Sequence, residues 1–583
     1  MRRAFITRGL FFLILLASPL LAQQSASPAP LEPSQLPART ISYLLWRGAP
    51  PADIRHANAL MALWDDPDSA PLRNSMVQAL LSDTKKQKDK PALTRDELNE
   101  YAALLDNSFV VGYLPRPADQ SASKPGSSPS SATLTPAWNG LFLVYDRTGK
   151  EAILAKAVLR MRGAETDIPK LTSLTVAGVT ALKIERKSSV TYWAETGKYA
   201  VSAGELSVFE EILSRVTGTA KGGALGDSPA YLEAKPLLNG GLLEFFLRVP
   251  SANDIASYST ASNPQLTAVF KNLKLDALHL IAGHLSFEGA KTRVQGAVLG
   301  DASAGSLFDI WADGKANPDT LRFLSASTVS FNESEINLLG IYKVIKQAFS
   351  QGSSNSEQMT AALESAAQTR LGMPLTDALA LTTGEIASLQ NSPTMDDTQQ
   401  VRILGIRNKP DAMKLLRTIM GEKITAERNE GAVTYMKISL GGTQGSAGVA
   451  QWNFYHLAMT PDFLLGSSKS EPLHALLAQS ASPSDTGSPK NILAARSQFP
   501  EKLNGFSYFD FQMVNWPAVK EKWLAEARTA AAKAKTTDDA DTSKKLTDWL
   551  SNVNPDVFPR HLHSMTGASW KDAKGVHFDE WVE

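Results

Sequence analysis

The sequence predicts an α+β protein made of two tandem pseudo-equivalent units, each a mainly antiparallel sheet with helices packed on it. The first observation is that Val190–Leu213 aligns without a gap with Phe454–Leu477, with apolar residues at the same positions. The second is that further segments recur in the same order along both halves. The third is an alternation of strand-length and helix-length patterns in the order β-α-β-β-α-β, an elaborated split βαβ or ferredoxin-like order.

The repeat is carried by hydrophobic spacing rather than by shared polar residues. Tyr199 aligns with Phe463, and Phe209 aligns with Leu473. Downstream, the Leu-Asn-Gly of 238–240 recurs at 503–505, and 278–283 resembles 562–567. Repeats of this kind are sought before other interpretations. The alternative is that two amphipathic α/β stretches look alike without common origin.

The amino terminus has the pattern of a secretory signal peptide over residues 1–22. Arg2, Arg3 and Arg8 form its basic region, an apolar core follows, and cleavage is expected after Ala22. The core is shorter than the ~20 residues that a membrane-spanning helix needs, so a permanent anchor is the weaker alternative. Residues 23–37 are rich in Pro, Ser and Ala and are expected to form a flexible spacer. The predicted location is therefore periplasmic or secreted.

The first α+β unit is predicted over 38–300. Strands are expected at 40–46, 141–145, 174–186, 190–203 and 242–249, with a hairpin at 278–298. Helices are expected at 52–64, 71–81, 94–105, 150–162 and 206–216. Thr94 and Glu97 have the spacing of a capping box at the start of the third helix. Residues 115–136 have low complexity and are expected to form a disordered loop.

The second unit is predicted over 318–583, after a connector at 301–317. Its strands are expected at 321–330, 401–406, 433–438 and 452–459, and its helices at 335–349, 357–369 and 411–420. A charged, alanine-rich helical insertion at about 516–550 has no counterpart in the first unit. Within it, 530–543 has little apolar content and is interpreted as a solvated helix end, with an interaction arm as the alternative.

Composition indicates an ordinary folded protein and offers no electrostatic partner. Lys plus Arg and Asp plus Glu both number 59, and removal of the signal leaves a net charge of about −3. No nucleic acid partner is expected, because a basic excess is missing. The chain has no cysteine, which excludes disulfides, thiol nucleophiles and lipid attachment at the cleavage site.

Motifs that carry chemistry are missing from the sequence. It contains no HExxH, Walker, GxGxxG or GxSxG pattern, so no catalytic, cofactor-binding or metal-binding residue is assigned, and no cofactor is expected. His561 and His563 would share one face of a strand. Only His577 or Asp579 could add a third ligand, and ordinary strand polarity is the preferred interpretation. Ser82 and Lys85 have Ser-x-x-Lys spacing, but they end a predicted helix.

The exported start, the duplicated halves and the strand-turn-strand-helix at 192–216 together resemble a family of exported bacterial proteins of unknown function. The resemblance covers most of the mature chain and implies no catalytic or binding residue. We expect a non-enzymatic protein that binds an unknown ligand or an envelope protein, in a cleft between the two halves. A hydrolase with a non-contiguous site and an envelope assembly subunit are the alternatives.

Overall fold

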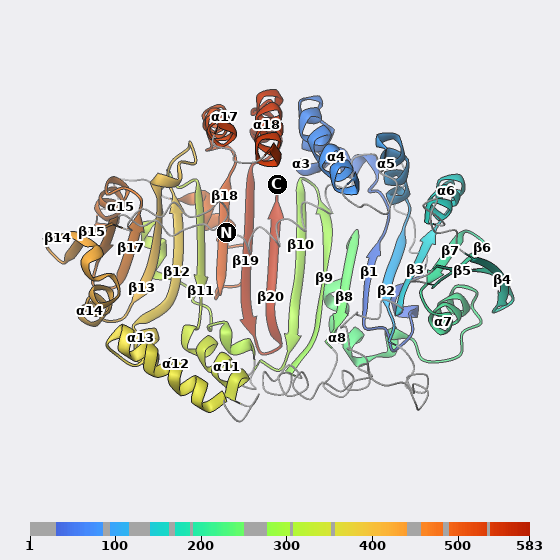
Figure 1. The fold of residues 1–583 in the computed structure, drawn as a ribbon, viewed down its shortest axis with the longest axis horizontal. Helices are drawn as coiled ribbons and strands as arrows, with labels where there is room; N and C mark the ends of the chain where they lie inside the picture. The colour runs from blue at the N-terminus through green and yellow to red at the C-terminus, as the bar shows by residue number, and fades with distance from the viewer. Residues whose placement is uncertain are drawn as a thin grey trace. The chain divides into compact units, whose positions relative to one another are not determined.

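A computed structural model describes residues 31–85, 94–115, 140–161, 170–186, 190–238, 240–249, 277–302, 307–350, 356–439, 456–481, 489–532 and 537–583. The described chain forms two compact units (Figure 1). Unit 1 contains the described residues up to 249 together with Leu278–Leu299 and Ser551–Val557. Unit 2 contains the described residues of Gly300–Leu550 and Phe558–Glu583. Helices and antiparallel strands make up both, which confirms the α+β class.

Unit 1 holds ten described strands in one sheet. They are β1 (Ser42–Trp46), β2 (Phe109–Tyr113), β3 (Leu141–Asp146), β4 (Lys170–Val176), β5 (Val179–Glu185), β6 (Val190–Thr196), β7 (Tyr199–Ala203), β8 (Leu243–Arg248), β9 (Leu278–Glu288) and β10 (Lys291–Gly300). The pairings give the order β10-β9-β8-β1-β2-β3-β7-β6-β5-β4. Gly112 of β2 is required, because a Cβ there would collide with the Phe142 ring and the Ser42 carbonyl.

The helices of unit 1 lie on both faces of this sheet. They are α2 (Ala52–Ala57), α3 (Ala59–Asp65), α4 (Ala70–Lys85), α5 (Arg95–Ala102), α6 (Glu151–Met161), α7 (Leu206–Val216) and α8 (Pro229–Leu238). The apolar stripe of α7, with Phe209 and Ile212, and that of α8, with Ala234, pack on Tyr43 and Phe246. The predicted capping box is confirmed: Thr94 accepts from the Glu97 amide, and the Glu97 carboxylate accepts from the Thr94 amide.

Unit 2 also holds ten described strands in one sheet. They are β11 (Ser330–Glu335), β12 (Thr382–Gln390), β13 (Gln400–Ile406), β14 (Ile424–Glu430), β15 (Val433–Ile438), β16 (His456–Met459), β17 (Phe463–Ser467), β18 (Gly505–Asp510), β19 (Ser564–Asp572) and β20 (Gly575–Val582). Their order is β20-β19-β18-β11-β12-β13-β17-β16-β15-β14.

The helices of unit 2 are α11 (Leu338–Ser350), α12 (Ser356–Leu371), α13 (Leu375–Ala380), α14 (Lys409–Met420), α15 (Glu471–Ala481), α16 (Lys490–Arg496), α17 (Trp516–Ala532), α18 (Thr537–Asn552) and α19 (Val557–His561). Leu476 of α15 and Ile492 of α16 pack on Phe331 and Phe506. We call the sheet face covered by α15 and α16 the inner face, and the opposite face the outer face. The corresponding inner face of unit 1 is the one covered by α7 and α8.

The strand order of unit 2 equals that of unit 1 with every strand number raised by ten. The shared order follows from the pairings within each unit. That the two units arose by duplication stays a prediction. The ferredoxin-like order is wrong in detail, because every register that the described strands define is antiparallel, whereas a split βαβ unit places two strands side by side in parallel.

Several expected boundaries are also corrected. Leu31 and Leu36 of the expected spacer are buried in the unit 1 core, at 4% and 0% exposure, because these two leucines provide apolar surface that the Pro-rich remainder lacks. The strand expected at 321–330 is wrong: a short 3-10 helix, Asp319–Phe323, precedes β11. Gly300, predicted to end the first unit, and the described residues of the predicted connector at 301–317 belong to unit 2. Residues 1–22 and 116–136, the predicted signal and most of the predicted loop, lie outside the described residues.

Candidate functional site

The inner face of unit 2 carries three buried carboxyl groups on two neighbouring strands. Glu333 and Glu335 alternate along β11, so their side chains share one face. Glu385 of β12 lies opposite Glu335 in the β11–β12 ladder. All three residues are at most 4% exposed. Buried carboxylates are rare unless they are paired, so this cluster needs a partner of opposite charge.

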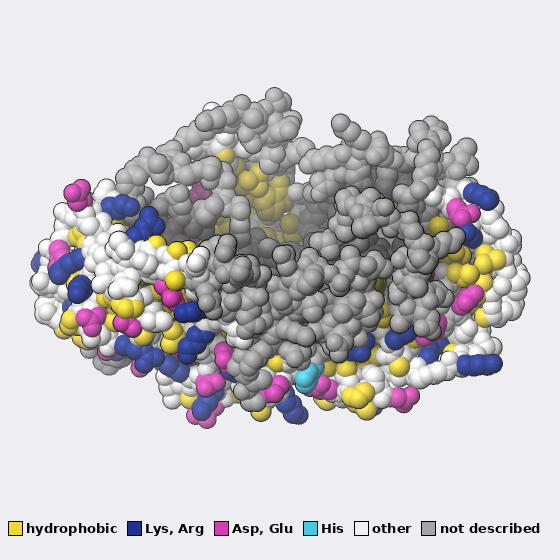
Figure 2. Space-filling model, turned by 60° about the horizontal axis from the view of Figure 1, so that its bottom comes forward, with side chains coloured by type: hydrophobic (Ala, Val, Ile, Leu, Met, Phe, Trp, Pro, Cys, Tyr) yellow, Lys and Arg dark blue, Asp and Glu magenta, His cyan; other side chains and the backbone are white. Residues whose placement is uncertain are grey.

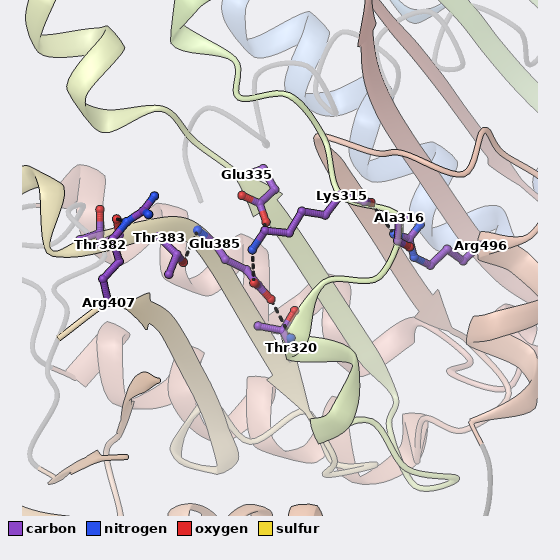
Figure 3. A network of polar contacts seen from close by, with 9 residues as sticks. All are labelled: Lys315, Ala316, Thr320, Glu335, Thr382, Thr383, Glu385, Arg407 and Arg496. Carbon is purple, nitrogen blue, oxygen red and sulfur yellow. Dashed lines mark hydrogen bonds and ion pairs between the residues drawn. The ribbon is translucent and has the colours of Figure 1, made fainter. Parts of the chain in front are cut away.

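Lys315 provides that partner for two of the three groups (Figure 3). Its Nζ lies 2.8 Å from Glu385 Oε2 and 3.1 Å from Glu335 Oε1. Glu385 Oε1 also accepts from the Thr320 amide at 2.6 Å. Burial opposes the charge on Lys315, but its bonds to Glu385 and Glu335 raise its pKa above the usual value. The arrangement ties the segment at Lys315 to β11 and β12.

Glu333 is the carboxyl group that Lys315 leaves unbonded. Neither of its oxygens has a hydrogen-bond partner among the described residues. Burial raises the pKa of Glu333 to about 8, against the lowering effect of the Arg496 charge. Arg496 Nη2 instead donates to the carbonyls of Lys315 and Ala316, at 3.2 and 3.1 Å. At neutral pH Glu333 is therefore mostly protonated.

The outer face of the same strands is hollowed. Twelve residues of β11, β18, β19 and β20 line a shallow hollow of about 250 Å³. The side chains on this face are those of Asn332, Ser334, Ser507, Ser569, Phe578 and Glu580, because they alternate with the inward-facing Glu333, Phe506, Ala568 and Asp579. The hollow and the buried carboxyl cluster thus lie on opposite faces of one sheet.

Two glycines make the floor of the hollow. A Cβ at Gly505 would lie 2.9 Å from Ser569 Oγ, and a Cβ at Gly567 would lie 2.9 Å from Ser507 Oγ. Either side chain would crowd the hydroxyl beside it. The two glycines therefore keep the sheet surface low between the surrounding polar groups.

The polar groups around this floor are available for hydrogen bonding. The side chains of Asn332, Ser334 and Ser569 make no hydrogen bond with any residue that the structure describes. Ser507 Oγ makes one long bond, 3.4 Å, to the Gly567 carbonyl. Exposed and half-exposed groups of this kind bond to water or to a ligand.

A second and larger pocket, of about 390 Å³, has polar side chains that already bond to one another. It lies between the β12–β13 loop and α15. There Ser392 bonds Thr394 at 2.9 Å, Asp396 accepts from the Thr398 amide, and Asn391 accepts from Thr328. Its polar groups hold the loop together, so the hollow is the stronger candidate for a ligand site.

Unit 1 provides an internal comparison for the outer face. Its strands β1, β8 and β9 correspond to β11, β18 and β19 in sheet order. There the outer face carries large apolar side chains, including Leu44, Phe245 and Leu285, which form a hydrophobic cluster with Trp46. The same face of the same architecture is therefore apolar in one unit and polar in the other.

The residues considered from the sequence are not brought together. His561 ends α19 and His563 precedes β19, so the two do not share a strand face. The expectation failed because the strand begins at Ser564. His577 lies at the far end of the β19–β20 hairpin, opposite Trp570, with its Nε2 3.0 Å from Asp572 Oδ2. Among the described residues, no group of three His, Asp or Glu side chains could hold a metal ion. Ser82 and Lys85 lie in the last turn of α4.

Sequence reasoning missed the residues of the hollow. The sequence pattern predicts this strand at 321–330, earlier than β11, so it does not assign Asn332 and Ser334 to a sheet. The available signal was the alternation in 330–335, where polar residues and buried ones take turns. That pattern is also typical of any half-buried strand.

Figure 2 shows charged side chains of both signs on the described part of one face. Lys and Arg side chains there are interspersed with Asp and Glu among the described residues. This distribution agrees with the balanced composition. No helix within the described ranges has the length and apolar content needed to cross a bilayer.

Comparison with known proteins adds no family. No family model matches the chain. No curated protein matches it either. Two solved structures, crystal forms I and III of TP0453, align with 47% of this chain and with 80% and 81% of theirs, at 10% and 9% identity. Their TM-scores of 0.20 and 0.17 are too low for any structural or functional argument.

Proposed function

We propose that this chain is an exported protein that binds a ligand rather than transforming one, and that its ligand site is the outer-face hollow of unit 2. The observation that carries the proposal is the set of unbonded polar side chains at Asn332, Ser334 and Ser569. They stand on a sheet face that is apolar in unit 1. Export is supported by the signal-like pattern of residues 1–22.

Binding is favoured over hydrolysis by the residue types in the hollow. Its side chains provide hydroxyls, one amide, one aromatic ring and the carboxylate of Glu580. A nucleophile needs a base within hydrogen-bond reach. No histidine or lysine lines the hollow, and the Ser507 hydroxyl donates to the Gly567 carbonyl rather than to a base. Glu333, whose pKa burial raises to about 8, points to the other face.

The test is native mass spectrometry of the mature protein purified from its own envelope. Wild type is expected to carry a stoichiometric adduct. Ser507→Leu is expected to lose it, because a leucine there would lie over the Gly567 floor. Asn332→Ala removes the amide without adding bulk and is expected to reduce occupancy.

Ser202→Leu is the matched control. Ser202 is a half-buried strand serine of β7 in unit 1, so its change tests the general effect of a leucine on a sheet. It is expected to keep the adduct, and circular dichroism should show all variants folded. A wild type without an adduct, or an adduct kept by folded Ser507→Leu, would overturn the proposal.

A further inference from the structure

We infer that the ligand of the outer-face hollow is a neutral saccharide. The inference rests on the proposed function and names the ligand class for the same site. It is carried by the juxtaposition of hydroxyl and amide groups, one apolar ring and a glycine floor on a single sheet face.

The polar groups of the hollow have the hydrogen-bonding capacity that a sugar needs. Serine hydroxyls and the Asn332 amide each offer donors and acceptors, so the ring of groups around the floor matches a ligand whose own groups do both. Sugar hydroxyls have this property. An apolar acyl chain would instead leave Asn332, Ser334 and Ser569 desolvated and unpaired.

The hollow also offers an aromatic ring against which a sugar can pack. Phe578 of β20 lies opposite Ser569 and is half-buried on the outer face. Its ring offers an apolar surface beside the polar groups. The C–H face of a pyranose ring is apolar while its rim carries hydroxyls, so one sugar ring can pack against Phe578 and reach the serines.

Charge selects among saccharides. No lysine or arginine lines the hollow, and its charged lining side chain is Glu580. Phosphate, sulfate or carboxylate groups call for cationic partners. The lining therefore offers no cationic partner to an anionic sugar.

The backbone argues against a peptide strand. The amide and carbonyl groups of β11, β18 and β19 are engaged in ladders on both sides. Strand addition needs an open sheet edge, and the hollow lies on the face of paired strands. Its volume is below that of most drug-sized pockets, so it suits one sugar ring with the rest in solvent.

The experiment is saturation-transfer NMR of the full mature chain with defined probes. The neutral probes are glucose, N-acetylglucosamine, maltose and cellobiose. The anionic probes are glucuronic acid and glucose 6-phosphate. At least one neutral probe is expected to bind, with the anionic analogues at least tenfold weaker.

Variants assign the binding to the hollow. Phe578→Leu keeps an apolar side chain but removes the ring, and we expect affinity to fall about tenfold. Asn332→Ala should weaken binding by a similar factor. Phe245→Leu, on the outer face of unit 1, is the matched control and should bind like wild type.

The outcomes separate this inference from the proposed function. If no neutral sugar binds, but Ser507→Leu loses a different adduct, the saccharide inference fails and the proposed function stands. If sugars bind equally to Phe578→Leu and Asn332→Ala, the hollow is not their site and the inference fails. If neither sugar nor adduct depends on the hollow, both fail.

Discussion

Glu333 lies opposite Phe506 in the β11–β18 ladder, so a carboxyl group faces an aromatic residue inside the core of unit 2. Unit 1 has the mirror arrangement, because Leu45 of β1 lies opposite Glu244 of β8. Both strand pairs thus hold a buried glutamate opposite an apolar residue, Glu333 on β11 and Glu244 on β8. Glu244 is paired with Arg47 at 2.8 Å, whereas Glu333 has no hydrogen-bond partner among the described residues.

This difference predicts that Glu333→Leu stabilises unit 2 at neutral pH. The folded-state pKa of Glu333, about 8, is above the ordinary 4.5, so the folded protein holds a proton that the unfolded chain releases. The contribution of Glu333 to the free energy of unfolding is fully present below pH 4.5 and is lost as the pH rises through 8. Over this range the free energy of unfolding falls by up to about 1.4 kcal/mol per pH unit. The leucine variant should lack this slope.

Hydrogen exchange of β11 and β18 peptides at pH 5, 7 and 8.5 would measure this effect within unit 2. Glu333→Gln is the control that removes titration but keeps a polar group, and it should flatten the slope without the full gain in stability. Equal pH slopes for wild type and Glu333→Leu would show that Glu333 is not the group that titrates.

Lys315→Met is expected to destabilise unit 2 by about 3 kcal/mol at pH 7, because it leaves Glu335 and Glu385 buried without a cation. Burial already raises the pKa of Glu335, and this pKa should rise further when its lysine is gone, so the loss should shrink at pH 4, where Glu335 is protonated. Urea unfolding at both pH values would measure this loss of stability.

Lys346→Met is the control for Lys315→Met. Its pair with Glu364 is exposed, and we expect a change below about 1 kcal/mol. Similar losses for the two variants would contradict the buried-pair explanation.

In unit 1, Arg47→Met should cost about 3 kcal/mol because Glu244 is 3% exposed and would lose its partner. Burial already raises the pKa of Glu244, and Arg47 opposes that effect. Adding Glu244→Leu should recover most of the loss, since the pair is then replaced by apolar groups. A double-mutant cycle by chemical unfolding would measure the coupling. Additive effects would mean that the two residues act independently.

Gly112→Ala is expected to destabilise unit 1 by about 1–3 kcal/mol, because its Cβ would lie 2.8 Å from the Ser42 carbonyl and against the Phe142 ring. Gly223→Ala is the control. Its nearest neighbour would be the Ala38 Cβ at 3.5 Å, an ordinary contact. Thermal unfolding of both variants would show the difference. A Gly112→Ala protein with wild-type stability would mean that β2 can shift within the sheet.

Much of the local structure could be predicted from the sequence. Helix α7 follows from apolar residues at helical spacing, and the β6–β7 hairpin follows from two apolar runs around a glycine turn. The cap at Thr94 depends on residues three apart. Such features are local, so neighbouring residues determine them.

Only the tertiary structure shows which distant strands pair, because local sequence patterns do not specify the strand order. The order of the strands brings β1 between β2 and β8, and β11 between β12 and β18, which are pairings of residues fifty or more positions apart. The sequence therefore determined the α+β class, the likeness of the two halves and the missing cysteine chemistry. The pairing across distant strands alone decided that Lys315 meets Glu335 and Glu385, and that Asn332, Ser507 and Ser569 surround one hollow. Those side chains come from separate segments, and only long-range hydrogen bonding in the sheet places them together.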